Sequence, residues 1–309
     1  MTSTGSARAP SCTNTADELA EPLAASAGVA RAWLLIEHPG PWKRDPFAAG
    51  FDQEVRAELE RRAAGSAVKI LAIRRGDGAG AHRRRVIVAH CGPGQAWLAT
   101  STVVREQELL DLDMEAVAEG RTPEQLEPLT VSLYLVCTHA GRDACCGRLG
   151  RPLADQLGTV HPGRVWECSH LGGHRFAANL VCLPHGVLYG RVDLAAGDGP
   201  RLAERYEKSR LDLDHLRGMS WQAPPVQAAD LFVRRHTGLL AVDDVEPVAT
   251  TDMGDGLWLV EMRTPGTPAG SWEAHVRHVP TGQPRPFSCS TEELEDPGRW
   301  ELVDLRSGP

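Results

Sequence analysis

The chain has 309 residues, of which 42% are apolar, and it carries a formal net charge of −8. This length predicts two or three domains with ordinary hydrophobic cores, and the acidic balance argues against nucleic acid or an anionic membrane as the main partner. We expect no membrane insertion, because no run of about 18 apolar residues occurs. The N-terminal segment lacks the hydrophobic region of a signal peptide, so we expect a cytoplasmic protein.

The first 125 residues show a regular succession of strand and helix patterns. Apolar runs predict strands at 31–37, 68–75, 84–90 and 95–101, and helical spacing predicts helices at 52–65 and 105–119. The resulting order is β-α-β-β-β-α.

The same order returns about a hundred residues later. Strands are predicted at 129–136, 164–168, 179–183 and 187–192, and helices at 146–157 and 201–218. A β-α-β half followed by a β-β-α half is the thioredoxin-like arrangement, in which a central sheet has helices on both faces. We therefore predict an α/β protein with two tandem thioredoxin-like units, residues 1–125 and 126–222.

Residues 223–309 have a different pattern. A helix is predicted at 226–236, followed by strands at 257–263, 272–278 and 299–305 whose alternation indicates one exposed face. We expect a small α+β C-terminal unit that packs on the second domain.

Cysteines and histidines gather in two loops of the second unit. In CTHAGRDACCG, Cys137 ends the first strand, while Cys145 and Cys146 begin the next helix. In ECSHLGGHRF, His170 and His174 flank two glycines. These two loops are neighbours in a thioredoxin-like fold, so we expect their thiols and imidazoles to meet.

Both loops have chemical reasons to bind metal. Exposed N–H groups at a helix N-terminus stabilise a thiolate, and glycines allow the backbone conformations that turn two imidazoles the same way. Two thiolates and two imidazoles suit zinc or a Rieske-type mixed-ligand cluster. Spacing alone does not exclude Cys145 in favour of Cys146.

These two segments, extended to CSHLGGHRFAANLVCLPHGVLYGRV, resemble the sucrase/ferredoxin-like family of thioredoxin-like 2Fe-2S ferredoxins, as does EHPGPW at 37–42. The resemblance implies one 2Fe-2S cluster in the second unit. Its ligands would be Cys137, Cys146, His170 and His174, with Cys145 the alternative to Cys146. The first unit lacks a cysteine pair, so we expect no cluster there, and its EHPGPW loop is a candidate to cover the cluster of the second unit.

The remaining polar residues have simpler interpretations. Arg142 and Asp143 are candidates to fix the ligand loop, Asp143 also as a helix cap, and Arg175 either supplies positive charge or is a plain surface arginine. His139 and His185 lie in turns and are expected to be solvent-exposed. Structural core positions are expected for Cys12, Cys91, Cys168, Cys182 and Cys289, with a place near the cluster as an alternative ligand left open for Cys168.

The ligand set predicts one-electron chemistry. Neutral imidazoles in place of thiolates raise the potential above that of an all-cysteine cluster, and their second nitrogens couple the potential to pH. We expect a non-enzymatic electron carrier between a donor reductase and an acceptor protein; an oxidoreductase is the enzymatic alternative. A structural Cys2His2 zinc interaction module and an iron or redox sensor would use the same ligands.

Overall fold

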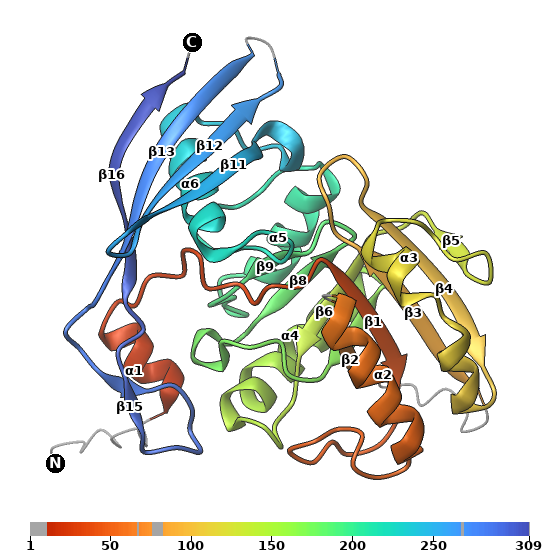
Figure 1. Cartoon of the computed structure of the whole chain (residues 1–309). Coiled ribbons are helices and arrows are strands. Elements are labelled where there is room, and N and C mark those ends of the chain that lie inside the picture. The colour runs from red at the N-terminus through yellow and green to blue at the C-terminus, as the bar shows by residue number, and fades with distance from the viewer. Residues whose placement is uncertain (1–10, 67, 76–82, 267–268, 309) are drawn as a thin grey trace, which may run out of the picture.

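The computed structural model describes residues 11–66, 68–75, 83–266 and 269–308. It shows a mixed α/β protein with a ten-stranded sheet, a four-stranded antiparallel sheet and a two-stranded ribbon (Figure 1). The predicted α/β class is thereby confirmed. The thioredoxin-like arrangement and the domain boundaries at 125 and 222 stay predictions.

The first half of the large sheet follows a short N-terminal helix, α1 (Cys12–Glu18). Its elements are β1 (Ala32–Glu37), α2 (Gln53–Ser66), β2 (Val68–Arg74), β3 (Arg84–His90), β4 (Trp97–Val103), α3 (Met114–Ala118) and β5 (Glu127–Leu129). The helix predicted at 105–119 is wrong in its continuity: a 3₁₀ turn at Glu106–Asp111 precedes α3. Asp113 interrupts the helix because its side chain accepts a hydrogen bond from the backbone of Ala116 and so caps a new one.

The second half repeats this order. Its elements are β6 (Leu133–Cys137), α4 (Ala144–Val160), β7 (Val165–Cys168), β8 (Leu180–Leu183), β9 (Val187–Tyr189) and α5 (Asp198–Glu207). The strand order β7-β6-β8-β9 matches β2-β1-β3-β4 of the first half, and in both the first strand is parallel to the second and antiparallel to the third.

Two element predictions in this half are wrong in extent. The helix expected at 201–218 ends at Glu207, and β10 (Leu216–Met219) pairs with β9 instead. Between them the carboxylate of Asp212 accepts hydrogen bonds from the backbone of Asp214 and His215, which favours a turn over a helix. The strand expected at 129–136 is divided between β5 and β6.

The two halves join edge to edge through β2 and β7. The strands are antiparallel, with Ile73 opposite Cys168 and Arg74 opposite Glu167. The guanidinium of Arg74 lies 2.7 Å from the carboxylate of Glu167, and both side chains are largely buried. This seam makes one sheet of ten strands and brings the chain after β7 against the first half.

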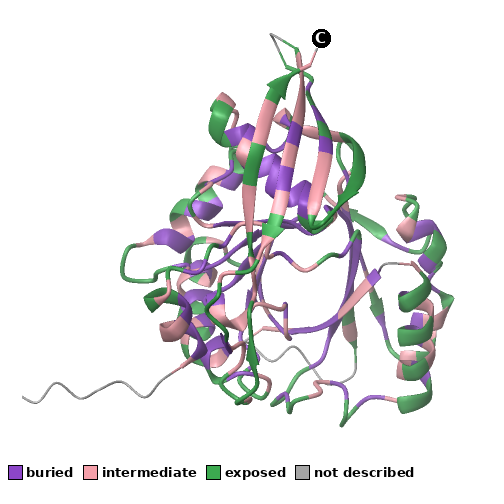
Figure 2. Ribbon diagram, turned by 60° about the vertical axis from the view of Figure 1, so that its left-hand side comes forward, coloured by how far each residue is buried: buried purple, intermediate pink, exposed green. Residues whose placement is uncertain are grey.

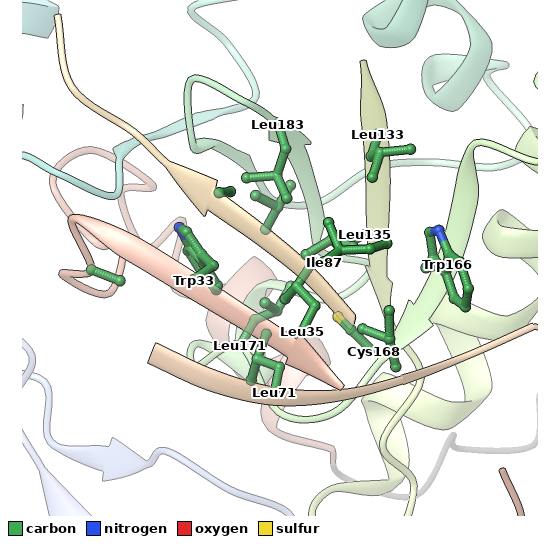
Figure 3. Packing of buried hydrophobic residues seen from close by; sticks show 14 of the residues in the cluster. Trp33, Leu35, Leu71, Ile87, Leu133, Leu135, Trp166, Cys168, Leu171 and Leu183 are labelled. Carbon is green, nitrogen blue, oxygen red and sulfur yellow. The ribbon is translucent and has the colours of Figure 1, made fainter. Parts of the chain in front are cut away.

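Each half has helices on one face of its strands, which differs from the predicted arrangement with helices on both faces. In the first half, α2 and α3 pack on one face, and in the second half α4 and α5 do so. The opposite faces share a core, in which Trp33 and Leu35 of β1 meet Leu133 and Leu135 of β6 (Figure 3). Successive side chains of a strand point alternately to the helices and to the shared core, so both faces of the large sheet are apolar.

The C-terminal unit packs around one amphipathic helix. It consists of α6 (Pro224–Thr237), β11 (Glu246–Gly254), β12 (Leu257–Thr264), β13 (Gly270–Val279) and β16 (Arg299–Ser307). The inner side chains of this sheet cover α6, while its outer face is largely exposed (Figure 2).

Between β13 and β16 the chain leaves the sheet as a strap, residues 280–298. The strap contains β14 (Arg285–Pro286) and β15 (Leu294–Glu295) and runs beside α1 (Figure 1). A buried ion pair of 2.9 Å joins Arg285 of the strap to Glu21, just after α1. The N-terminal and C-terminal segments therefore meet on the second half.

Candidate metal centre

Three of the predicted ligands come together where β6 and β7 end. Cys137 lies at the end of β6 on the shared-core side, Cys146 is in the first turn of α4, and His170 follows β7. Their ligand atoms all lie within 4.8 Å of one another. Both cysteines are about 1% exposed. Two loops separated by more than twenty residues thus form one buried donor group.

The helix α4 can approach β6 closely because of one glycine. A Cβ on Gly150 would lie 2.0 Å from the carbonyl oxygen of Cys137, so no other residue fits there. Asp143 caps the helix by accepting a hydrogen bond from the backbone of Cys145, as the sequence suggested. The cap and the close packing together orient the Cys146 thiol toward Cys137.

His174 lies beside this donor group and outside it. Its ring centroid is 5.1 Å from that of His170, and its Nε2 is 3.8 Å from a carboxylate oxygen of Asp143. Both of its ring nitrogens, and Nδ1 of His170, are buried without a hydrogen-bond partner among the described residues. Buried polar atoms normally have partners, and a bound metal would supply the partner that these nitrogens lack.

Two cations that the sequence analysis missed, the buried Arg217 and the half-buried Lys69, support the histidine loop. Arg217 of β10 is 1% exposed and donates to the carbonyl of Gly172 and the side chain of Asn179. Lys69 of β2 donates to the carbonyl of Leu171 at 3.0 Å. Burial lowers the pKa of Arg217 to about 9, with a contribution from Arg175, and burial also lowers the pKa of Lys69. No local sequence signal marks either residue.

Neighbouring donors favour the thiolate of Cys137. Hydrogen bonding to Cys146 is the largest cause that lowers the pKa of Cys137 well below its ordinary value, and it outweighs the opposing effect of burial. The pKa of Cys146 is raised by the same pairing. The pair therefore favours one thiolate and one thiol, and a cation would favour two thiolates.

The EHPGPW loop of the first half lies on the cysteine loop, and its predicted position over a cluster stays a prediction. The rings of Trp42 and His139 meet edge to face with centroids 5.9 Å apart, and Nε2 of His139 lies 2.6 Å from the carbonyl of Lys43. The expectation that His139 is exposed is wrong, because this cover leaves it 1% exposed. His185 is half-buried and contacts the hydroxyl of Tyr206.

The vicinal cysteines point to different neighbours. Cys146 faces Cys137 and His170, whereas Cys145 lies 3.6 Å from Cys12 and 3.4 Å from Cys289, sulfur to sulfur. Cys289 is exposed, so the expectation that it lies in the core is wrong. Cys91, Cys168 and Cys182 are fully buried, as expected. Arg175 is no plain surface residue, since it pairs with Glu21 at 2.7 Å.

A cavity of about 510 Å³ lies next to His170. It is bounded by α2, β2 and the loop after the EHPGPW segment, and its lining includes Arg56, Leu59, Arg142 and His170. The cavity gives the imidazole edge of the donor group access to the surface, while its thiols stay buried.

A model of the sucrase/ferredoxin-like family matches residues 23–199, which is more than half of the chain and includes the whole donor group. The chain therefore belongs to the sucrase/ferredoxin-like family. It is 41% identical over 67 residues to a protein named altered inheritance of mitochondria protein 32 from Kluyveromyces lactis, a match that covers 21% of each chain. The protein of the same name from Debaryomyces hansenii is 37% identical over 70 residues, 19% of this chain and 26% of the relative.

The chain thus spans about a quarter or less of the length of these curated relatives. No solved structure matches. Among the described residues, no helix is long and apolar enough to cross a membrane.

Proposed function

We propose that this protein is a one-electron carrier with a single 2Fe-2S cluster held by Cys137, Cys146, His170 and His174. The observation that carries the proposal is the buried donor group itself. Two thiols and one imidazole converge within 4.8 Å, and a second imidazole stands beside them with both nitrogens unpartnered. When bound, such a cluster accepts and releases one electron at a potential set by its ligands.

The donor chemistry fits this cluster. Two thiolates and two neutral imidazoles leave an oxidised 2Fe-2S cluster close to neutral, because two ferric ions and two sulfides carry about +2. Membership of a ferredoxin-like family supports iron over other metals. We also propose that each half is a variant of the thioredoxin-like unit with its helices on one face, which the repeated strand order supports.

The surrounding residues would hold the ligands in place and tune their charge. Arg217 and Lys69 fix the histidine loop by its carbonyl oxygens. Both cations lie behind the donor group, where they favour thiolates and an added electron. Trp42 and His139 cover the cysteine side of the donor group and exclude water from it. The electrostatic interactions of Arg217 and Lys69 with the ligands are stronger there, because the local dielectric constant is low.

We propose that electrons arrive from a reductase at the imidazole edge and leave to an acceptor protein. This edge faces the cavity lined by Arg56 and Arg142, whereas the thiols are buried. The ring nitrogens of cluster-bound imidazoles that do not bind iron would bind protons more tightly after reduction, so the potential should fall as pH rises from 6 to 9. A potential that stays flat over this range would contradict proton coupling. We further propose that the protein acts in the cytoplasm.

The test is anaerobic purification followed by iron and sulfide analysis and EPR of the reduced protein. We expect two iron and two sulfide per chain, with the signal lost in Cys146→Ser and altered or lost in His170→Ala and His174→Ala. Cys145→Ser is the matched control, since its thiol points away from the donor group. Loss of iron in Cys145→Ser with retention in Cys146→Ser would overturn the ligand assignment.

A structural zinc site is the second candidate for the same residues. The ligand atoms of Cys137, Cys146 and His170 are close enough together for a single ion. A colourless protein whose zinc disappears in Cys146→Ser would favour this candidate over the electron carrier.

A further inference from the structure

Three cysteines from distant parts of the chain meet on the far side of α4. We call them the thiol triad: Cys12 of α1, Cys145 of α4 and Cys289 of the strap. Their sulfurs are 3.6, 3.4 and 3.4 Å apart. The carboxylate of Asp143 completes the group, with its oxygens 3.6 and 3.7 Å from the sulfur of Cys12. All four ligand atoms lie within 4.8 Å of one another.

This spacing is that of a tetrahedral metal site. Sulfur ligands lie about 2.3 Å from zinc, which places two of them about 3.8 Å apart in a tetrahedron. We propose that the thiol triad and Asp143 form a second metal site that binds one Zn²⁺ ion. The site is separate from the donor group of Cys137 and Cys146, and its proposal does not rest on the electron-carrier function.

The geometry favours a metal over a disulfide. A disulfide would join two of the sulfurs at about 2.05 Å and leave the third unpaired. Here the three distances are nearly equal, so no pair is preferred, and a carboxylate faces the same point. A zinc ion uses all four groups, whereas a disulfide uses two of them.

Asp143 is held as a ligand would be. One of its oxygens accepts a hydrogen bond from the backbone of Cys145 at 2.9 Å. The other accepts from the backbone of Cys289 at 2.8 Å and from the hydroxyl of Ser288 at 3.0 Å. Such partners orient a ligating carboxylate.

The thiols are already gathered for one ion. Their sulfurs lie within 3.6 Å of one another, so they would bind Zn²⁺ with little rearrangement and release their protons on binding. Cys289 is exposed, so the ion has a path of entry.

The site would join three segments that otherwise share few apolar contacts. The hydrophobic cluster around the triad contains only Cys12, Cys145 and Ala177, with Leu149 at its edge, among the described residues. A bound ion would therefore fasten α1 and the strap to the start of α4. Two of its ligands, Cys12 and Cys289, lie outside residues 23–199, the part that the family model matches.

The test is metal analysis of the full chain, purified anaerobically with a reductant and without chelators. We expect about one zinc per chain in the wild type and a loss of most of it in Cys289→Ala and Cys12→Ala. Cys289 is exposed, so its replacement should leave folding intact, which circular dichroism checks. Cys91→Ala is the matched control, a buried cysteine outside both groups that should keep its zinc.

Two further measurements separate the alternatives. Chelator-treated wild type, with reduced thiols, should take up one Co²⁺ and show thiolate-to-cobalt charge-transfer absorption that Cys289→Ala lacks. Cys146→Ser should lose iron and keep zinc. The proposal is overturned if reduced wild type binds neither zinc nor cobalt, or if zinc is lost in Cys146→Ser and kept in Cys289→Ala. A disulfide within the triad, found by intact mass in freshly isolated protein, would equally overturn it.

Discussion

The two halves of the large sheet have the same strand order and different chemistry at the same place. Where β6 ends in Cys137, β1 ends in Glu37, and His38 follows. The carboxylate of Glu37 accepts a hydrogen bond from the backbone of Arg85, and Nδ1 of His38 lies 3.0 Å from a guanidinium nitrogen of Arg84. The first half therefore uses this strand end for an internal polar network. A shared topology supplies a position, and the residues there decide what it does.

The comparison also shows that the halves are unequal partners. The first half contributes Lys69 and Arg74 to the seam, and Trp42 covers the cysteine loop. Lys69 and Trp42 contact loops of the second half, and Arg74 pairs with Glu167 of strand β7. The first half thus repeats the strand order of the second half and also supports the candidate metal centre.

The largest expected effect comes from the buried cation of the second half. Replacing Arg217 with methionine removes the donors to Gly172, Asn179 and Ser26 and leaves one buried and two partly buried acceptors without this partner. We expect a loss of about 3–4 kcal/mol in the free energy of unfolding, measured by urea denaturation. Arg148→Ala, at an exposed arginine of α4, is the control and should change little. Equal stability of the two variants would show that the histidine loop does not depend on Arg217.

The two glycines of the histidine loop should differ in their tolerance of a side chain. Both have positive φ, 90° at Gly172 and 68° at Gly173, but only at Gly173 would a Cβ meet the guanidinium of Arg217, at 2.2 Å. We expect Gly172→Ala to cost about 1 kcal/mol from backbone strain and Gly173→Ala to cost about 2–3 kcal/mol. Thermal denaturation compares them, and a larger cost at Gly172 would contradict this packing.

Breaking the seam should have an intermediate effect. Glu167→Gln removes the ion pair with Arg74. It also removes the charge of the carboxylate that accepts a hydrogen bond from the hydroxyl of Thr138. Both partners of the ion pair are largely buried, so we expect a loss of about 2 kcal/mol in stability. Glu204→Gln breaks an exposed pair with Lys208 and should have little effect, because solvent screens it. Similar urea midpoints for the two variants would mean that the seam ion pair contributes nothing.

The smallest effect should be a pH dependence that arises in the first half. Burial, and then the charge of Arg84, lower the pKa of His38 below its ordinary value near 6.5. As pH falls below 6.5, His38 is protonated in the unfolded chain before it is protonated in the folded chain. Protonation therefore favours unfolding, and the folded protein is less stable at low pH than at neutral pH. His38→Gln should reduce the drop in urea midpoint between pH 7.5 and 5.5. An unchanged drop would show that His38 does not contribute to it.

Much of the secondary structure was predictable because strands and helices carry strong local patterns. The buried strands β1, β2, β3, β6 and β8 appear within a few residues of their predicted positions. The errors fall where side chains compete for the backbone, at Asp113 and Asp212, since capping and turn formation depend on single hydrogen bonds. The stacking of the two halves on a shared core was not predictable, because a strand that is apolar on both faces does not reveal what covers each one.

The candidate donors were recognisable from the sequence alone, and their partners were not. Thiols, imidazoles and glycines in two short segments indicated Cys137, His170, His174 and one of the vicinal cysteines as candidates, and the family resemblance favoured Cys146 over Cys145. Only the tertiary structure brought Arg217 and Lys69 beneath the histidine loop and gathered Cys12, Cys145 and Cys289 at one point. The physical reason is distance along the chain. Local patterns report the chemistry of neighbouring residues, whereas contacts between residues that are distant along the chain are decided by how the packed layers fold back on one another.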